Sequence, residues 1–239
     1  MTRLRLCVLL PILEHKYFEE VTYKEFRGAA RPDTEITVVS IERGPASIEC
    51  WYDEEVAAPW ILEKVKGTEE RGFNAVIIDC MGDPALYAAR ELVKIPVIGP
   101  CEASMALAST LGHKFSIVTV LKSVVPLFEK LVSAYGFESK MAPVRSVEVP
   151  VLKLEEKRAE VRAALLAESR KAIEEDRADV IILGCTGMIG MAKELYEALG
   201  YPVIDPAIAS LKLAEVLHEM GLSHSKKFYM TPPEKTRKL

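Results

Sequence analysis

The 239-residue chain lacks the features that mark membrane, metal and nucleotide proteins. No apolar run approaches the roughly 18 residues that a transmembrane helix needs. Glycine-rich phosphate loops and the HExxH motif are absent. Its five cysteines are scattered and include no CxxC pair, so we expect neither a structural zinc nor a disulfide scaffold. These absences argue against metal, nucleotide and nicotinamide cofactors, and we expect no cofactor.

An excess of either charge is also missing, because 31 Lys and Arg balance 35 Asp and Glu, for a formal net charge of -4. We therefore expect a small-molecule substrate and neither nucleic acid nor a membrane surface as partner. Pro11 interrupts the apolar N-terminal stretch LRLCVLLPIL, and charged Glu14 and Lys16 follow it. This stretch predicts a first strand rather than a secretion signal, so we expect a cytoplasmic protein.

Short runs rich in valine and isoleucine alternate with amphipathic segments of helical length along the whole chain. This alternation is typical of α/β proteins, in which helices cover parallel sheets. The expected strands are 4–10, 35–41, 75–79, 95–99, 114–120, 145–152, 179–184 and 201–205. The expected helices are about 14–28, 53–71, 84–93, 103–111, 123–135, 155–175, 188–199 and 207–220.

Two stretches of the chain look like copies of one another. Residues 75–107 and 180–213 both begin with a β-branched run, pass through Cys-x-Gly, continue into a helix-like block and close on Pro-Val-Ile-x-Pro. The first copy carries Cys80 and the second carries Cys185 at the same place. The duplication predicts two pseudo-symmetric, flavodoxin-like α/β domains, each with a parallel sheet of about four strands flanked by helices.

The domain boundaries follow from the same duplication. Residues 1–99 together with 207–239 are expected to form the first domain, which carries Cys80. Residues 100–206 are expected to form the second, which carries Cys185. We expect the active site in the cleft between them.

The matched cysteines stand where ligands of open parallel sheets bind, at the carboxyl end of a strand. Small residues follow each cysteine, so backbone N–H groups at a helix start are expected to bind developing negative charge and to lower the pKa of the thiol. A lone cysteine at a strand end is more often part of the packing. Two at matching positions favour function, whereas Cys7, Cys50 and Cys101 are interpreted as packing residues.

Two thiols on opposite sides of one small molecule suggest a reaction. A thiolate removes a proton from a carbon next to a carbonyl, and a thiol returns a proton to the other face, which inverts the configuration. Backbone N–H groups would stabilise the enolate between the two steps. Thr119, near the end of its strand, is placed to face the cleft. Asp83 fits a helix cap at least as well as a catalytic role, and Glu102 fits pairing or substrate orientation equally.

The cysteine motifs resemble those of the hydantoin and allantoin racemases. DCMGDPALYAARELVKIPVIGPCEA is similar to their first motif, LGCTGM to their second, FSIVTV to their central strand, and FYMTPPEKTRK to their tail. The likeness covers nearly the whole chain, and motifs at this spacing are specific to the wider cofactor-independent aspartate/glutamate/hydantoin racemase superfamily. The resemblance implies a PLP-independent racemase or epimerase with Cys80 and Cys185 as the two acid/base residues.

The resemblance also implies the substrate contacts. They come from the backbone after each cysteine, from the end of the first strand, and from two further side chains: Met81, Gly82, Thr186, Gly187, Pro11, Ile12, Thr119 and Glu102. Three positions depart from the relatives. Ile12 stands where hydantoin racemases carry asparagine, Met81 replaces a phenylalanine, and Gly187 stands where glutamate racemases carry histidine.

Several functions remain open at this level. The first is racemisation of 5-substituted hydantoins or a related cyclic ureide such as allantoin, by a homo-oligomer of two or more subunits. The second is an aspartate/glutamate-type racemase or a maleate-isomerase-like enzyme. Arylmalonate decarboxylases share the superfamily fold but use one cysteine, so the presence of both speaks against that chemistry. From another class, the chain fits a two-lobed small-molecule binding protein or a cysteine redox sensor.

Overall fold

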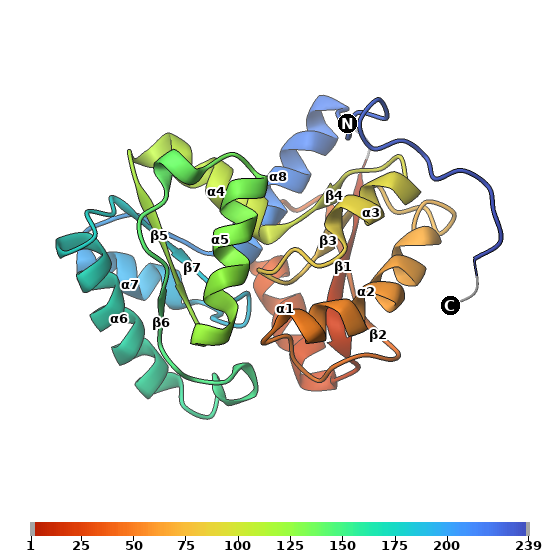
Figure 1. Ribbon diagram of the computed structural model, residues 1–239. Coiled ribbons are helices and arrows are strands. Elements are labelled where there is room, and N and C mark those ends of the chain that lie inside the picture. The colour runs from red at the N-terminus through yellow and green to blue at the C-terminus, as the bar shows by residue number, and fades with distance from the viewer. Residues whose placement is uncertain (1–2, 238–239) are drawn as a thin grey trace.

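The computed structural model of the protein describes residues 3–237 and contains two similar halves (Figure 1). The elements of the first half are β1 (Leu4–Leu13), α1 (Lys16–Ala29), β2 (Thr34–Ile41), α2 (Trp51–Lys66), β3 (Ala75–Ile78), α3 (Leu86–Leu92), β4 (Val97–Ile98) and α4 (Pro100–Leu111). Those of the second are β5 (Phe115–Thr119), α5 (Val125–Ala134), β6 (Arg145–Ser146), α6 (Arg158–Glu174), β7 (Val180–Leu183), α7 (Met191–Leu199), β8 (Val203–Ile204) and α8 (Pro206–Met220). Short 3-10 turns occupy Lys122–Val124, Glu138–Lys140 and Val151–Lys153.

The strands form two sheets with the same topology. The first sheet has the order β2-β1-β3-β4, the second has the order β6-β5-β7-β8, and every pair of neighbours is parallel. The central strands β3 and β7 are buried along their full length, which explains why their sequences are continuous apolar runs rather than alternating ones. The predicted fold class, two small parallel sheets covered by helices, is confirmed.

Side chains of the first sheet alternate between two apolar layers. Leu6, Val8 and Ile77 face one layer, which includes residues of α8, whereas Leu9 and Ile78 face the other, which includes residues of α2 and α3. Helix α8 packs on β3, β1 and β4, and α4 packs on β7 and β5 of the other sheet. Each of these helices therefore packs on the sheet that does not contain the strand before it, so the chain crosses between the sheets twice (Figure 1). Helices α4 and α8 also pack on each other. This arrangement brings the carboxyl ends of β3 and β7 together.

The structure corrects two details of the sequence interpretation. Strand β6 ends at Ser146 rather than near residue 152, because Glu148 adopts a left-handed backbone conformation with φ 57° and Pro150 lacks an N–H for the ladder. The basic, Pro-containing sequence after Gly221 predicts a solvated or loosely packed tail, but the segment is held on its own chain at His224 and Tyr229, while most of residues 230–237 are exposed. The Tyr229 hydroxyl accepts a hydrogen bond from Arg90 at 3.0 Å, and the His224 ring lies 2.9 Å from the backbone of Val97. None of the helices formed by residues 3–237 is long and apolar enough to cross a membrane.

Candidate active site

Two turns of the same shape follow β3 and β7. Each cysteine stands two residues beyond its strand, and its carbonyl accepts a hydrogen bond from the residue three positions later: Asp83 N–H to Cys80 at 3.0 Å, and Met188 N–H to Cys185 at 3.2 Å. A left-handed residue then precedes each helix, Ala85 with φ 58° and Gly190 with φ 72°. The duplicated sequence therefore folds into duplicated backbone.

The two turns meet across the boundary between the halves. The Thr186 hydroxyl, next to Cys185, donates a hydrogen bond of 3.2 Å to the carbonyl of Asp79, next to Cys80. The two thiols interact electrostatically, and each is half-buried. The structure thus brings the turns of Cys80 and Cys185 together.

Burial controls the protonation of both thiols. It raises the pKa of Cys80 well above its usual value and that of Cys185 to about 12. The expectation of lowered pKa values is wrong, because α3 begins only at Leu86 and α7 only at Met191, too far along the chain for a first-turn effect. The backbone supplies the opposing influence, since the Gly187 N–H donates to the Cys185 sulfur at 3.3 Å and the Gly82 N–H favours the Cys80 thiolate.

A different side chain covers the glycine of each Cys-x-Gly turn. A Cβ placed on Gly82 would lie 1.9 Å from Oε1 of Glu54 and 3.8 Å from the Cys80 sulfur. A Cβ placed on Gly187 would lie 3.3 Å from a methyl group of Leu154 and 3.5 Å from the Cys185 sulfur. Sequence reasoning missed Glu54, because it is one of two acidic residues in the first turn of α2, where acids are ordinary helix-dipole partners.

Asp83 caps a helix, but not the one that follows it. Its carboxylate accepts hydrogen bonds from the N–H groups of Cys101 and Glu102, at 3.0 and 2.9 Å, in the first turn of α4. The Tyr135 hydroxyl donates a third, at 2.8 Å. Burial nevertheless raises the pKa of Asp83 to about 7. The predicted cap of α3 is wrong, since Ala85 occupies that position and Asp83 instead ties the Cys80 turn to the second half.

The hydroxyl and carboxyl candidates have partners in the protein. The fully buried Thr119 donates to the carbonyl of Gly184 at 3.1 Å, directly before Cys185. Glu102 forms an ion pair with Arg90, and about a third of its side chain is exposed. The structure therefore places Thr119 against the second cysteine turn and gives Glu102 a structural partner.

The remaining candidates divide between backbone and packing positions. Pro11 and Ile12 lie in β1 at a register irregularity, between residues 10 and 13. Met81 is buried and packs with Cys101 and Met105, so only its backbone faces the turn. Gly82 and Gly187 offer N–H groups beside the thiols, as predicted from their sequence positions.

Two acids beside the turns, Asp79 and Glu25, were also missed, and they lie with Asp205, which the sequence places near a domain crossing as a residue for pairing or substrate orientation. Asp79 precedes Cys80, and burial raises its pKa to about 7, while its Oδ1 has no hydrogen-bond partner in the described structure. Asp205 caps α8 through the N–H of Ala207 at 3.0 Å. Burial and neighbouring acids raise the pKa of Glu25 to about 9, and this residue hydrogen-bonds to Asp205. Only tertiary structure brings these distant residues together.

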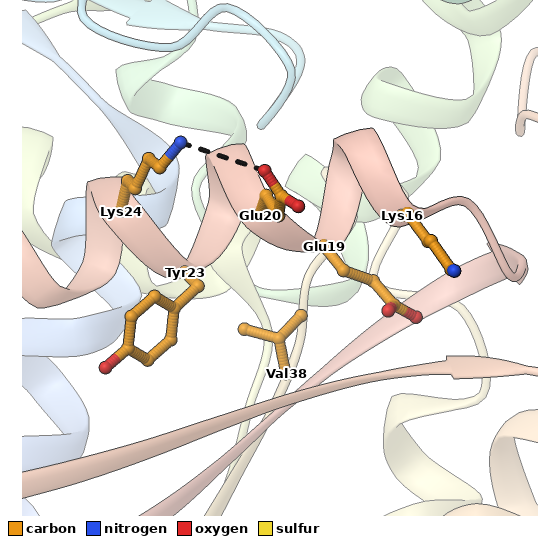
Figure 2. A pocket seen from close by; sticks show the side chains of 6 residues that line it. All are labelled: Lys16, Glu19, Glu20, Tyr23, Lys24 and Val38. Atoms are coloured by element: carbon orange, nitrogen blue, oxygen red, sulfur yellow. Dashed lines mark ion pairs between the residues drawn. The ribbon is translucent and has the colours of Figure 1, made fainter.

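Two surface hollows lie outside this site. The larger has a volume of about 390 Å³ and is lined by residues of α1 and by Val38 of β2, including the Lys24–Glu20 ion pair (Figure 2). The other lies around residues 215–221 of α8. Neither includes a residue of the cysteine turns. Within residues 3–237, no group of three or more His, Cys, Asp or Glu side chains is arranged to hold a metal ion.

Comparison with known sequences shows which family the chain belongs to. The sequence model of the Asp/Glu/hydantoin racemase family matches residues 17–214. The chain belongs to this family. Among its relatives, the hydantoin racemase of Pseudomonas sp. (strain NS671) is 43% identical over 210 residues, covering 87% of this chain and 84% of that protein. The racemase family also confirms the predicted enzyme class, an isomerase.

Solved structures of the racemase family agree over almost the whole chain. The allantoin racemase from Klebsiella pneumoniae superimposes with a TM-score of 0.93, at 36% identity, over 98% of this chain and 96% of that one. Glutamate racemase from Francisella tularensis reaches a TM-score of 0.66 at 18% identity, over 94% and 85% of the two chains, and so shares the fold. The predicted resemblance to hydantoin and allantoin racemases is confirmed.

Proposed function

We propose that the protein is a cofactor-independent racemase that inverts a carbon next to a carbonyl in 5-substituted hydantoins. Allantoin belongs to this class, because it is a hydantoin with a ureido group on C5. The observation that supports the proposal is the pair of matched Cys-x-Gly turns, which contact each other and have a backbone N–H beside each sulfur. The hydantoin and allantoin racemases that resemble this chain support the substrate class.

The proposed reaction has two proton transfers. One cysteine, as thiolate, takes the hydrogen from C5, and the electron pair of the broken C–H bond moves to the C4 carbonyl oxygen as an enolate. The opposite cysteine, as thiol, donates its proton to the other face of C5. The ring carries the inverted centre, and the two sulfurs have exchanged protonation states, so proton exchange with solvent or a reverse turnover resets the site.

The environment of the thiols suits them to remove a proton from C5 of the ring. A carbon next to a carbonyl is a weak acid, and a thiolate with a raised pKa is a stronger base toward it. Burial raises the pKa of both sulfurs, while the N–H groups of Gly82 and Gly187 stabilise the charge when it forms. The same N–H groups supply donors for an enolate oxygen in a site partly shielded from water.

The substrate contacts are part of the proposal. Backbone groups at Met81, Gly82, Thr186 and Gly187 would bind the ring, with Thr119 supporting the second turn. Pro11 and Ile12 would border the site at the end of β1. We propose that Glu102 acts on it only through its ion pair with Arg90.

Three further features remain proposals. Residues 1–99 with 207–239 would form one domain and residues 100–206 the other, supported by the packing of α8 on the first sheet and α4 on the second. The protein would assemble as a homo-oligomer of two or more subunits. A cytoplasmic location agrees with five free cysteines.

Optical rotation of single enantiomers tests the function. Wild-type enzyme at pH 7 should racemise 5-methylhydantoin, 5-benzylhydantoin or allantoin well above the rate without enzyme. L-aspartate, L-glutamate and maleate form the competing panel. Turnover of an amino acid or of maleate, with no turnover of any hydantoin, would instead support an aspartate/glutamate-type racemase or a maleate-isomerase-like enzyme. No turnover of any compound would favour a binding protein or redox sensor.

A further inference from the structure

The carboxyl group of Glu54 lies against the turn of Cys80. Gly82 has room for no side chain, because a Cβ there would meet Glu54 Oε1 at 1.9 Å, and the Cys80 sulfur lies 3.8 Å from the same point. The oxygen is buried and has no hydrogen-bond partner among the described residues. An unpaired buried carboxyl oxygen costs stability, so its retention calls for a physical role.

The second half has no acid in this place. The matching position over Gly187 is taken by Leu154, an apolar side chain that is 4% exposed. The Gly187 N–H donates to the Cys185 sulfur at 3.3 Å. The two turns therefore present the same backbone to their sulfurs, but a carboxyl group covers one and a methyl group covers the other.

The charged groups around the thiols follow the same division. After burial, the strongest influence on the Cys80 thiol is the Glu54 carboxyl, which opposes the thiolate, and Asp83 and Cys185 add to it. After burial, the strongest influence on Cys185 is the Gly187 N–H, which favours the thiolate. Asp79 and Glu49 also face Cys185, with smaller opposing effects.

We propose that Glu54 is a positioning residue that makes Cys80 the harder of the two thiols to ionise, so that Cys185 is the first to form the thiolate. The proposal rests on the two-base function above and adds which sulfur is poised as donor and which as base. Cys185 would then act first on the enantiomer that presents its hydrogen to the second turn. Cys80 would act first as the proton donor.

Glu54 serves this role once its carboxyl group is ionised. Burial and Asp83 raise its pKa to about 8, while Lys130 opposes the shift and Asp53 and Glu55 add to it. Below that pH the neutral carboxyl leaves the Cys80 thiol undisturbed. Above it the carboxylate forms first, and its charge then repels a thiolate on Cys80.

Alkylation by iodoacetamide tests the proposal without any substrate. The rate at each cysteine is followed by peptide mass spectrometry at pH 10, below the pKa of Cys185, where the rate is proportional to the thiolate fraction. In the wild type, Cys185 should react faster than Cys80 by about tenfold or more. In Glu54→Gln, the rate at Cys80 should rise about tenfold, and the rate at Cys185 should stay unchanged.

Three variants complete the experiment. Glu54→Leu copies the second turn and should reproduce the Gln result, whereas Glu54→Asp should keep the rate at Cys80 low. Glu63→Gln, on the exposed face of the same helix, should change neither rate. A wild-type rate at Cys80 equal to or above that at Cys185, or an unchanged rate at Cys80 in both Glu54→Gln and Glu54→Leu, would overturn the proposal. Since racemisation is measured separately, failure of the proposed function would show in a different assay.

Discussion

The Cys80 turn and the Cys185 turn share a backbone but not the side chains that support it. Both place a thiol two residues beyond a buried central strand, and both enter the next helix through a left-handed residue. Glu54 covers one glycine and Leu154 covers the other. Backbone geometry is therefore what the two halves share at the thiols, and the surrounding side chains make the two sulfurs unequal.

The helices that cross the boundary between the halves, α4 and α8, are capped from different places in the sequence. Asp205 caps α8 from the conventional position directly before the helix. Gly99 stands at that position before α4, where a Cβ would lie 2.4 Å from the Asp83 carboxyl, and Asp83 supplies the cap from the cysteine turn. The same hydrogen-bonding need is met from two places in the sequence.

The capping aspartates also take different partners. Tyr135, at the end of α5, donates to Asp83, while Glu25, on α1, hydrogen-bonds to Asp205. A phenol donates throughout the neutral pH range, but a carboxylic acid donates only while protonated. The donor to the first cap is thus present throughout this range, whereas the donor to the second is lost when Glu25 ionises.

The largest expected effect is the loss of racemisation when either thiol is removed, which tests whether both turns are needed. Cys80→Ala and Cys185→Ala should each lower racemisation by roughly 10³-fold or more, because no other side chain replaces either proton carrier. Circular dichroism should show an unchanged fold. Cys7→Ala, which removes a buried thiol of β1, should remain active, although less stable. Full activity in either site variant would refute the two-base mechanism.

The two caps should differ in stability. Asp83→Ala removes three hydrogen bonds and should cost about 3 kcal/mol in the free energy of unfolding. Asp205→Ala also removes a cap but relieves the crowding of acids around Glu25, so it should cost about 1 kcal/mol. Urea unfolding measures both. Equal losses in the free energy of unfolding would mean that the partners of the two caps, Tyr135 and Glu25, do not affect stability.

The residues before the cysteines sharpen the comparison further. Gly184 lies against Thr119 so closely that a Cβ would meet its Cα at 2.6 Å, and Gly184→Ala should cost about 2 kcal/mol. Asp79 holds the matching position with a full side chain that has an unpaired oxygen. Asp79→Ala should therefore change the free energy of unfolding by less than about 1 kcal/mol. Equal costs would contradict the difference in packing.

The last comparison concerns the change in stability per pH unit. The pKa of Glu25 is raised by burial to about 9, above its value in the unfolded chain, so its contribution to stability is full at pH 4 and is lost as pH rises toward 9. Stability should fall over this range by at most about 1.4 kcal/mol per pH unit from this group. Glu25→Gln should flatten the melting temperature against pH between 5 and 9. Glu63→Gln, on the exposed face of α2, should leave that slope unchanged, and a slope unaffected by Glu25→Gln would refute the assignment.

The sequence was sufficient for features that repeat. Buried strands such as β3 and β7 are continuous apolar runs, and the duplication located both cysteines at their carboxyl ends. Features that depend on one distant contact were not predictable. Glu54 looks like any acid at a helix start, Asp83 caps a helix 17 residues further along rather than the next one, and burial reverses the expected shift in the pKa of the thiols.

Deuterium labelling during the first turnovers tests the central claim, that two opposed thiols each handle one proton. A single enantiomer of a racemised hydantoin is incubated with enzyme in D₂O, and both enantiomers are separated and analysed by mass spectrometry before a tenth is converted. The account predicts that the product carries deuterium at C5 while the remaining substrate keeps its hydrogen. Product that retains the original hydrogen would show one base serving both faces and would contradict it.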